Sequence, residues 1–139
     1  MPSGTITAPT SAGRNRTILL VDDDRTTLQV IRKMLQQQGY TVLFATDSET
    51  ALKLFQLHSH PIDLLLCDIV MPHLSGPQLA ERIRAVRPTV PVLFISGLMQ
   101  EAAVQDWLRS GAKFLRKPVA RELLAEKVEE LIAPVIGSA

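Results

Sequence analysis

The sequence predicts an α/β domain in which helices cover both faces of a parallel β-sheet. Short apolar runs typical of strands alternate with segments whose apolar residues recur at helical spacing. Five such strand–helix repeats follow one another, and such repeats form parallel sheets with right-handed crossovers. Several apolar runs end in a carboxylate, a hydroxyl or a lysine. Because ligands of such sheets bind at the carboxyl ends of the strands, these groups are candidates for one site.

The length and composition indicate one domain. The chain has 139 residues, 46% of them hydrophobic, with 15 basic and 14 acidic side chains, which suits a single core. Residues 1–16 are rich in Pro, Ser, Thr and Gly, so they bury too little apolar surface to order themselves and are expected to be a flexible leader. The domain is expected over residues 17–136, with a short tail at 137–139.

The first two repeats are predicted between residues 17 and 57. Thr17–Val21 is a predicted strand, and Thr26–Gln38 has apolar residues at helical spacing. Thr41–Ala45 is the second predicted strand. Ser48 is then expected to cap a helix, because serine is a preferred residue at helix N-termini.

The remaining three repeats follow the same pattern. Ile62–Cys67 is almost uninterruptedly apolar, as expected of a strand whose two faces are both covered. Pro77 suits the first turn of a helix that runs to about Val86. The last predicted elements are, in chain order, the strand Pro91–Ile95, the helix Gln100–Ser110, the strand Lys113–Arg116 and the helix Ala120–Ala133.

The composition excludes several classes of function. A net charge of +1 without a basic stripe gives no case for binding nucleic acid. Cys67 is the only cysteine, so the chain can form neither an internal disulfide nor a thiolate metal site. No apolar stretch approaches the roughly 20 residues needed to cross a bilayer, and the N-terminus lacks the pattern of a secretion signal. We therefore expect a cytoplasmic protein that does not bind membranes.

Polar residues at the ends of the predicted strands suggest phosphoryl chemistry on a divalent metal. Three aspartates, Asp22–Asp24, close the first apolar run, and Asp68 closes the third. Clustered carboxylates repel one another, so they are expected mainly where a cation binds. Ser96 follows the fourth run, and Lys117 follows the fifth.

Four sequence fragments resemble the receiver domain of two-component response regulators. The resemblance covers roughly residues 17–133 and is closest to receivers of hybrid histidine kinases. It implies a flavodoxin-like (βα)5 doubly wound sheet with strand order 2-1-3-4-5. The fragments are Val21-Asp22-Asp23, Asp68-Ile69-Val70-Met71-Pro72 with Ser75-Gly76 after it, Ile95-Ser96-Gly97, and Gly111-Ala112-Lys113-Phe114-Leu115-Arg116-Lys117-Pro118.

The resemblance implies a phospho-acceptor in a His-Asp phosphorelay. Asp68 would accept a phosphoryl group from a phosphohistidine on a histidine kinase or a histidine phosphotransfer protein, forming an aspartyl phosphate. Lys117, aimed by a cis peptide bond to Pro118, and the Ser96 hydroxyl would stabilise charge on the phosphoryl oxygens. On this view the chain is not an enzyme for other substrates and catalyses only its own phosphorylation and dephosphorylation.

The resemblance also implies a Mg²⁺ site. Mg²⁺ prefers octahedral oxygen ligands and usually takes one or two carboxylates. Asp23 and Asp68 would be direct ligands, together with the backbone carbonyl of Val70. Asp22 would act through a metal-bound water.

The output implied by the family is a conformational switch. Ser96 would move toward the phosphoryl group, and Phe114 would fill the vacated space by packing alone, since it has no hydroxyl. The switched face would comprise helix 4 (Gln100–Ser110), strand 5 (Lys113–Arg116) and helix 5, and would bind a downstream protein that the sequence does not identify. Dimerisation through this face on phosphorylation stays open.

Two apolar residues suggest a long-lived phosphoryl group. In the family, side chains at the positions of Val70 and Leu98 influence the water that hydrolyses the acyl phosphate. Apolar groups cannot orient that water by hydrogen bonds. We therefore expect slow self-dephosphorylation.

Two rival functions share some of these sequence features. Asp22–Thr26 fits the DxDxT signature of haloacid-dehalogenase-type phosphatases, with Ser96 and Lys117 as their later motifs, but no strand-end acid follows Lys117 and Asp68 would have no role. A pseudo-receiver that only binds partners is disfavoured by the complete set of acids, hydroxyl and lysine. The chain could be a stand-alone receiver or one receiver of a hybrid kinase.

Some polar and aromatic residues have simpler interpretations. Asp24 is a candidate helix cap, and Cys67 is a candidate core residue. Trp107 is either a packed helix residue or a partner contact. His73, just past Asp68, could sense or shield the site.

Overall fold

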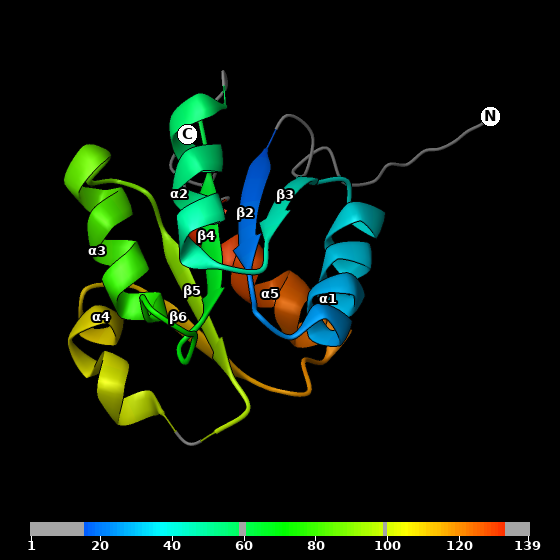
Figure 1. The fold of residues 1–139 in the computed structure, drawn as a ribbon. Coiled ribbons are helices and arrows are strands. Elements are labelled where there is room, and N and C mark those ends of the chain that lie inside the picture. The colour runs from blue at the N-terminus through cyan, green and yellow to red at the C-terminus, as the bar shows by residue number, and fades with distance from the viewer. Residues whose placement is uncertain (1–15, 59–60, 99, 133–139) are drawn as a thin grey trace, which may run out of the picture.

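A parallel sheet of five strands forms the centre of the molecule (Figure 1). The computed structural model describes residues 16–58, 61–98 and 100–132. The strands are β2 (Thr17–Val21), β3 (Thr41–Ala45), β4 (Leu64–Asp68), β5 (Val92–Ser96) and β6 (Lys113–Arg116). All neighbouring strands are parallel, in the order β3-β2-β4-β5-β6. Counted along the chain this is the order 2-1-3-4-5, which confirms the predicted fold.

Helices cover both faces of the sheet (Figure 1). On one face α1 and α5 pack against one apolar cluster, and on the other α2, α3 and the η2–α4 segment pack against a second cluster. The helices are α1 (Arg25–Gln37), α2 (Ser48–Leu57), α3 (Gly76–Val86), the 3-10 helix η2 (Glu101–Val104), α4 (Gln105–Arg109) and α5 (Arg121–Ile132). None of the helices in the described ranges is long and apolar enough to span a membrane.

The three central strands are buried along their whole length, as the apolar runs predicted. Every residue of β2, β4 and β5 is buried, because alternate side chains point into the two clusters. Asp68 and Ser96 are the last residues of β4 and β5. The sheet therefore delivers these two polar side chains to one edge.

Two predictions about the helices are wrong. Asp47, not Ser48, is the N-cap of α2, because its carboxylate accepts the Thr50 N–H at 2.7 Å. The single helix expected over Gln100–Ser110 is instead η2 followed by the five-residue α4, and neither has a side-chain cap. Gln100 is not a favoured capping residue, and the buried Val104 anchors the segment to the core instead.

The predicted ends of the chain fall largely outside the described residues. Residues 1–15 of the expected leader, residues 133–136 of the expected domain and the tail at 137–139 are not among them. These boundaries remain predictions. Arg16, the first described residue, lies 3.9 Å from the Asp63 carboxylate in an ion pair beside the start of β2.

Candidate functional site

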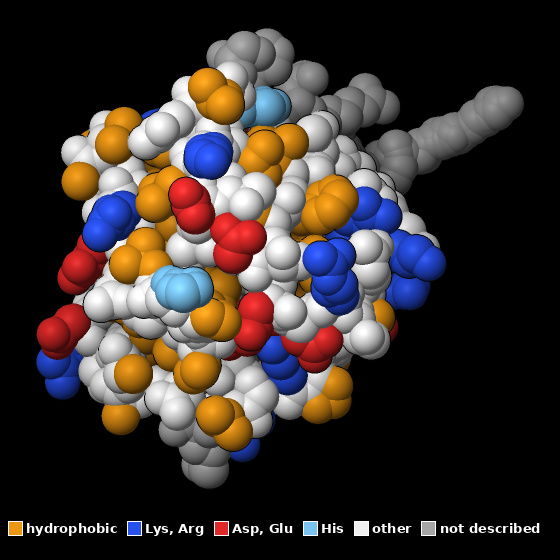
Figure 2. Space-filling view, in the orientation of Figure 1, with side chains coloured by type: hydrophobic (Ala, Val, Ile, Leu, Met, Phe, Trp, Pro, Cys, Tyr) orange, Lys and Arg blue, Asp and Glu red, His pale blue; other side chains and the backbone are white. Residues whose placement is uncertain are grey.

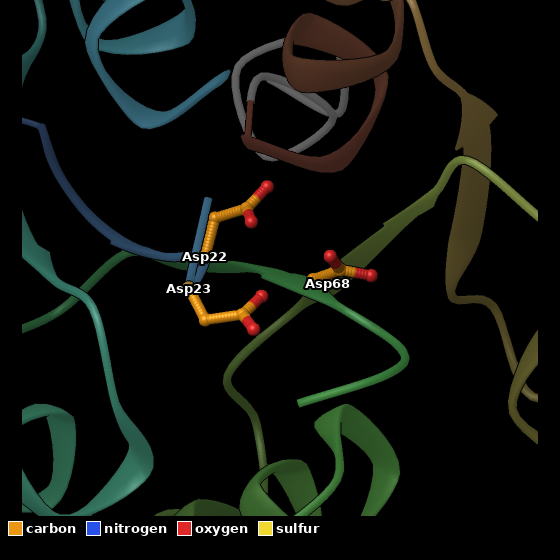
Figure 3. A group of neighbouring side chains, drawn as sticks. All are labelled: Asp22, Asp23 and Asp68. Atoms are coloured by element: carbon orange, nitrogen blue, oxygen red, sulfur yellow. The ribbon is translucent and has the colours of Figure 1, made fainter. Parts of the chain in front are cut away.

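Three aspartates converge at the carboxyl edge of the sheet (Figure 3). Asp22 follows β2, Asp68 ends the neighbouring β4, and the register pairs Val21 with Cys67 just before them. Asp23 extends from the next position along the chain. One carboxylate oxygen from each of the three aspartates lies within 4.8 Å of the other two. The sheet thus brings together residues 46 positions apart along the chain.

Lys117 joins two of these carboxylates. Its ammonium nitrogen lies 2.9 Å from Asp22 Oδ2 and 2.8 Å from Asp68 Oδ2. Lys117 follows β6, its backbone N–H donates to the Ser96 carbonyl at 2.9 Å, and its peptide bond to Pro118 is cis. The lysine side chain therefore reaches from the edge of β6 across β5 to β4 and β2.

Burial and charge act in opposite directions on this ion cluster. Burial raises the pKa of Asp22 above its ordinary value, although Lys117 and the Asp24 N–H both favour the carboxylate. Burial alone would lower the pKa of Lys117, but its hydrogen bonds to Asp68 and Asp22 and their charges raise the pKa overall. Lys117 is therefore a protonated ammonium at neutral pH.

The same local turn follows three of the strands. Asp22 Oδ1 accepts the Asp24 N–H at 2.9 Å, Asp68 Oδ1 accepts the Val70 N–H at 3.2 Å, and Ser96 Oγ accepts the Leu98 N–H at 3.1 Å. Each is a bond from a short polar side chain to the backbone two residues on. These turns fix the side chains, and in Asp22 and Asp68 they leave the second oxygen for the lysine.

The two predicted switch residues lie on the neighbouring strands β5 and β6. Ser96 is 1% exposed at the end of β5, and the register pairs it with Arg116, the residue before Lys117. Phe114 is half-buried on β6 and packs against the apolar cluster under α3 and α4. The side chain of Val70 is 48% exposed, so it lies in solvent at the rim of the site.

Gly76 allows α3 to pack closely against β4. In the sequence it was noted only as part of a motif. A Cβ atom on Gly76 would lie 2.2 Å from the backbone oxygen of Asp68. The start of α3 therefore lies directly against the end of β4, where only a hydrogen fits. The signal was present in the sequence, since Gly76 stands between the cap Ser75 and Pro77, but its contact with Asp68 depends on tertiary structure.

Asp24 and Cys67 have structural roles. Asp24 caps α1, with its carboxylate accepting the Thr26 N–H at 3.0 Å and the Thr27 hydroxyl at 2.9 Å. The Thr27 hydrogen bond is the main cause that lowers the pKa of Asp24. Cys67 is fully buried in the core, and its burial raises the pKa of the thiol far above the physiological range. This thiol is therefore inert at neutral pH.

Trp107 packs inside the domain as well as reaching the surface. The half-buried indole of α4 meets the ring of Phe94 edge-on at 5.7 Å between centroids. The Arg84 guanidinium of α3 lies 5.0 Å above the indole ring. His73 is exposed, with φ 68°, in the loop between β4 and α3.

The comparisons with known proteins agree with this geometry. The family model described as "Response regulator receiver domain" matches residues 18–129. The chain belongs to this family. It is a receiver domain of two-component signalling. A phosphatase of the haloacid-dehalogenase type is not supported, because its expected general acid, Asp24, is the cap of α1.

Curated relatives include kinases and transcriptional regulators. The sensor kinase CckA of Brucella abortus is 32% identical over 125 residues, which cover 88% of this chain and 13% of the kinase. The transcriptional regulatory protein ZraR of Escherichia coli is 31% identical over 120 residues, which cover 86% of this chain and 27% of the regulator. The chain spans between 13% and 50% of the length of the first relatives it matches.

Solved receiver structures match most of the chain. A response regulator receiver domain protein from Clostridium thermocellum has a TM-score of 0.80 and 30% identity, and the match covers 89% of this chain and 99% of that one. The receiver domain of the hybrid histidine kinase CckA has a TM-score of 0.71 and 36% identity, over 84% and 98% of the two chains. A CheX-CheY-BeF3-Mg complex from Borrelia burgdorferi has a TM-score of 0.78 and 28% identity, over 87% and 96%.

Proposed function

We propose that this receiver accepts a phosphoryl group on Asp68 from a phosphohistidine, in a Mg²⁺-dependent step of a His-Asp phosphorelay. The observation that carries the proposal is the position of the Asp68 carboxylate. It lies 2.8 Å from the Lys117 ammonium on one side and within a cluster of carboxylate oxygens on the other. A nucleophile placed between a fixed cation and a potential metal site suits phosphoryl transfer, which depends on positioning and charge stabilisation.

The residues present fit a Mg²⁺ ion. Three carboxylates face one ammonium, and beyond its ion pair with Lys117, Asp22 Oδ2 has no hydrogen-bond partner among the described residues. Oxygen donors with an excess of negative charge are what Mg²⁺ prefers. Asp23, Asp68 and the Val70 carbonyl would hold the ion, with Asp22 acting through water. When bound, it would neutralise charge on the phosphoryl oxygens.

The chemical step follows from the groups in place. An oxygen of the Asp68 carboxylate attacks phosphorus while the bond from phosphorus to the donor's imidazole nitrogen breaks, and the electron pair of that bond returns to the imidazole. The Lys117 ammonium donates to a phosphoryl oxygen. The Ser96 hydroxyl, which now only accepts a hydrogen bond, keeps its proton for another oxygen. Reversal and slow hydrolysis are the only other reactions we assign.

The partner that donates the phosphoryl group would be a histidine kinase or a histidine phosphotransfer protein. CckA, a relative over most of this chain, is a sensor kinase. Beside the site, α1 carries Arg25, Arg32 and Lys33 and no acidic residue. Figure 2 shows Lys and Arg side chains gathered over α1, next to Asp and Glu side chains. This charge pattern would favour a partner whose docking surface is acidic.

The output face would comprise η2–α4, β6 and α5. Surface ion pairs link these elements: Arg116 of β6 lies 3.5 Å from Glu101 of η2, and Lys113 lies 3.5 Å from Glu130 of α5. Neither η2 nor α4 has a side-chain cap, so this segment is weakly held by local interactions. A phosphoryl group adds about two negative charges. Movement of Ser96 toward it would change the conformation of this face, since Ser96 pairs with Arg116 of β6. A downstream protein, or a second copy of the chain, would bind there, in the cytoplasm.

Intact-protein mass spectrometry after incubation with acetyl phosphate and MgCl2 tests the proposal. We expect a labile adduct of one phosphoryl group on the wild type and none without Mg²⁺. Asp68→Asn should lose the adduct, whereas Asp24→Asn, which alters a neighbouring aspartate used only as a helix cap, should keep it. An adduct that persists in Asp68→Asn would contradict the proposal. A phosphohistidine donor should be tried before absence of any adduct is read as a pseudo-receiver.

A further inference from the structure

Ser48 carries a buried hydroxyl that has no role in the proposed reaction. Ser48, at the start of α2, is only 4% exposed. Its Oγ donates to the backbone carbonyl of Leu74 at 2.8 Å, 26 residues further along the chain. The buried polar and charged residues of the described part of the chain are Thr17, Asp22, Ser48, Asp68 and Ser96.

The acceptor of this hydrogen bond lies in the loop that carries a proposed metal ligand. Residues 69–75 connect β4 to α3 and follow Asp68 directly. The loop contains Val70, whose carbonyl is the proposed backbone ligand of Mg²⁺. The Ser48–Leu74 hydrogen bond therefore connects α2 to this loop. The position of the loop in turn determines where the Val70 carbonyl lies.

Packing and hydrogen bonds both hold the loop. Leu74 packs against the apolar cluster under α2 and α3, and the buried Ile69 and Met71 lie on either side of Val70. The base of the loop is closed by the Gly76 N–H, which donates to the Ile69 carbonyl at 2.9 Å. Above that base the chain reverses at His73, which has φ 68°, and the Leu74 N–H donates to Pro72 at 2.8 Å within the turn itself. Ser48 ties this turn to a separate helix.

The helix that carries Ser48 is firmly anchored. The Asp47 carboxylate caps it, accepting the Thr50 N–H at 2.7 Å and the Thr50 hydroxyl at 3.1 Å. Ala51, one turn on, is fully buried in the core. The Val70 side chain is 48% exposed, so the packing at this point of the loop comes from its neighbours Ile69 and Met71, which are 4% and 8% exposed.

We propose that Ser48 is a positioning residue for the Mg²⁺ site. Its hydrogen bond to Leu74 holds the β4–α3 loop, and so keeps the Val70 carbonyl in place to ligate the metal beside Asp68. This proposal rests on the proposed function, because it assigns Ser48 to the same metal site. Groups that orient the ligands of a metal affect its affinity without touching it.

Titration of the unphosphorylated protein with MgCl2, followed by amide NMR, tests this role. Loss of the hydroxyl in Ser48→Ala should raise the Mg²⁺ dissociation constant roughly threefold to tenfold. Loss of a group that bonds directly to a metal ligand typically lowers metal affinity by about tenfold or more, and Ser48 acts on the Val70 carbonyl only through the loop. The amide of Leu74 should also exchange with solvent faster. Ser48→Thr, which keeps a hydroxyl, should restore the affinity.

The matched control is Asp47→Ala, which weakens the same end of α2 but keeps the Ser48 hydroxyl. Its Mg²⁺ affinity should stay within about twofold of the wild type, because the Asp47 carboxylate hydrogen-bonds to Thr50 within α2. If Ser48→Ala does not fold, Ser48→Cys, with a similar size and a much weaker donor, takes its place.

The outcomes separate the two proposals. Equal Mg²⁺ affinity in the wild type and Ser48→Ala would overturn the role of Ser48 and leave the proposed function intact. An equal loss in Asp47→Ala would also overturn it, because the effect would then come from the stability of α2. A wild type that does not bind Mg²⁺ would overturn both proposals.

Discussion

Alanine at Gly76 would disturb the contact between α3 and the acceptor strand. The added Cβ would lie 2.2 Å from the Asp68 carbonyl oxygen and 3.1 Å from the Ile69 Cα. Real Cβ atoms essentially never approach other atoms closer than 3.0 Å, so the helix start and the strand end must separate by about 1 Å. That movement strains the hydrogen bond from the Gly76 N–H to the Ile69 carbonyl.

The expected loss of stability follows from two opposing effects. Overpacking of this kind costs about 3 kcal/mol, and the better helix propensity of alanine returns about 1 kcal/mol. Gly76→Ala should therefore lower the free energy of unfolding by about 2 kcal/mol, measured by urea denaturation. Its yield of phosphorylated protein should fall as well, because Asp68 shifts with the strand end.

A second glycine beside the site provides the control. A Cβ on Gly97 would lie 3.8 Å from the Lys117 side chain, which is an ordinary contact. Gly97→Ala should therefore change the free energy of unfolding by no more than about 0.5 kcal/mol. Equal stability of the Gly76 and Gly97 variants would refute the argument that close packing against Asp68 requires glycine.

Three further changes have defined outcomes. Asp47→Ala should lower the free energy of unfolding by about 1 kcal/mol through loss of the α2 cap. Folding lowers the pKa of Asp47 below its ordinary value of 3.8, mainly through the Thr50 N–H bond. Urea denaturation should therefore show this difference in full when the pH is well above that value, and the difference should shrink as the pH falls through it and below. Lys117→Met should prevent phosphorylation in the mass assay yet keep Mg²⁺ binding by NMR, and loss of both would contradict the assigned role. Val70→Asn combined with Leu98→Glu should shorten the phosphoryl lifetime roughly tenfold, because polar groups can orient the attacking water; an unchanged lifetime would refute the apolar explanation.

Much of the fold could be predicted because its strongest signals are local. The buried strands β2, β4 and β5 are apolar runs, and parallel strands covered on both faces require such runs. The position of Asp68 at a strand end followed from its place after Leu64–Cys67. Parallel pairing then predicts that the Asp68 carboxylate and the polar groups at the ends of the neighbouring strands share one edge of the sheet. At this edge the Lys117 ammonium forms its ion pair with Asp22.

The features that could not be predicted depend on contacts between distant segments. The break between η2 and α4 arises where Val104 is buried while no side chain caps either helix, and helical spacing alone does not show that. Ser48 resembled a cap, but Asp47 takes that place and leaves the Ser48 hydroxyl for Leu74. The clash that excludes a Cβ at Gly76 is likewise visible only once α3 lies against β4.

The most direct test of the account is to locate the phosphoryl group itself. An aspartyl phosphate is reduced by borohydride to homoserine, which tandem mass spectrometry of the digested protein can place at a single residue. After phosphorylation from a phosphohistidine donor with Mg²⁺, we predict homoserine at position 68 and at no other aspartate. Homoserine in place of Asp22, or none in a protein that carries the label on another type of residue, would contradict the assignment of Asp68 as the acceptor.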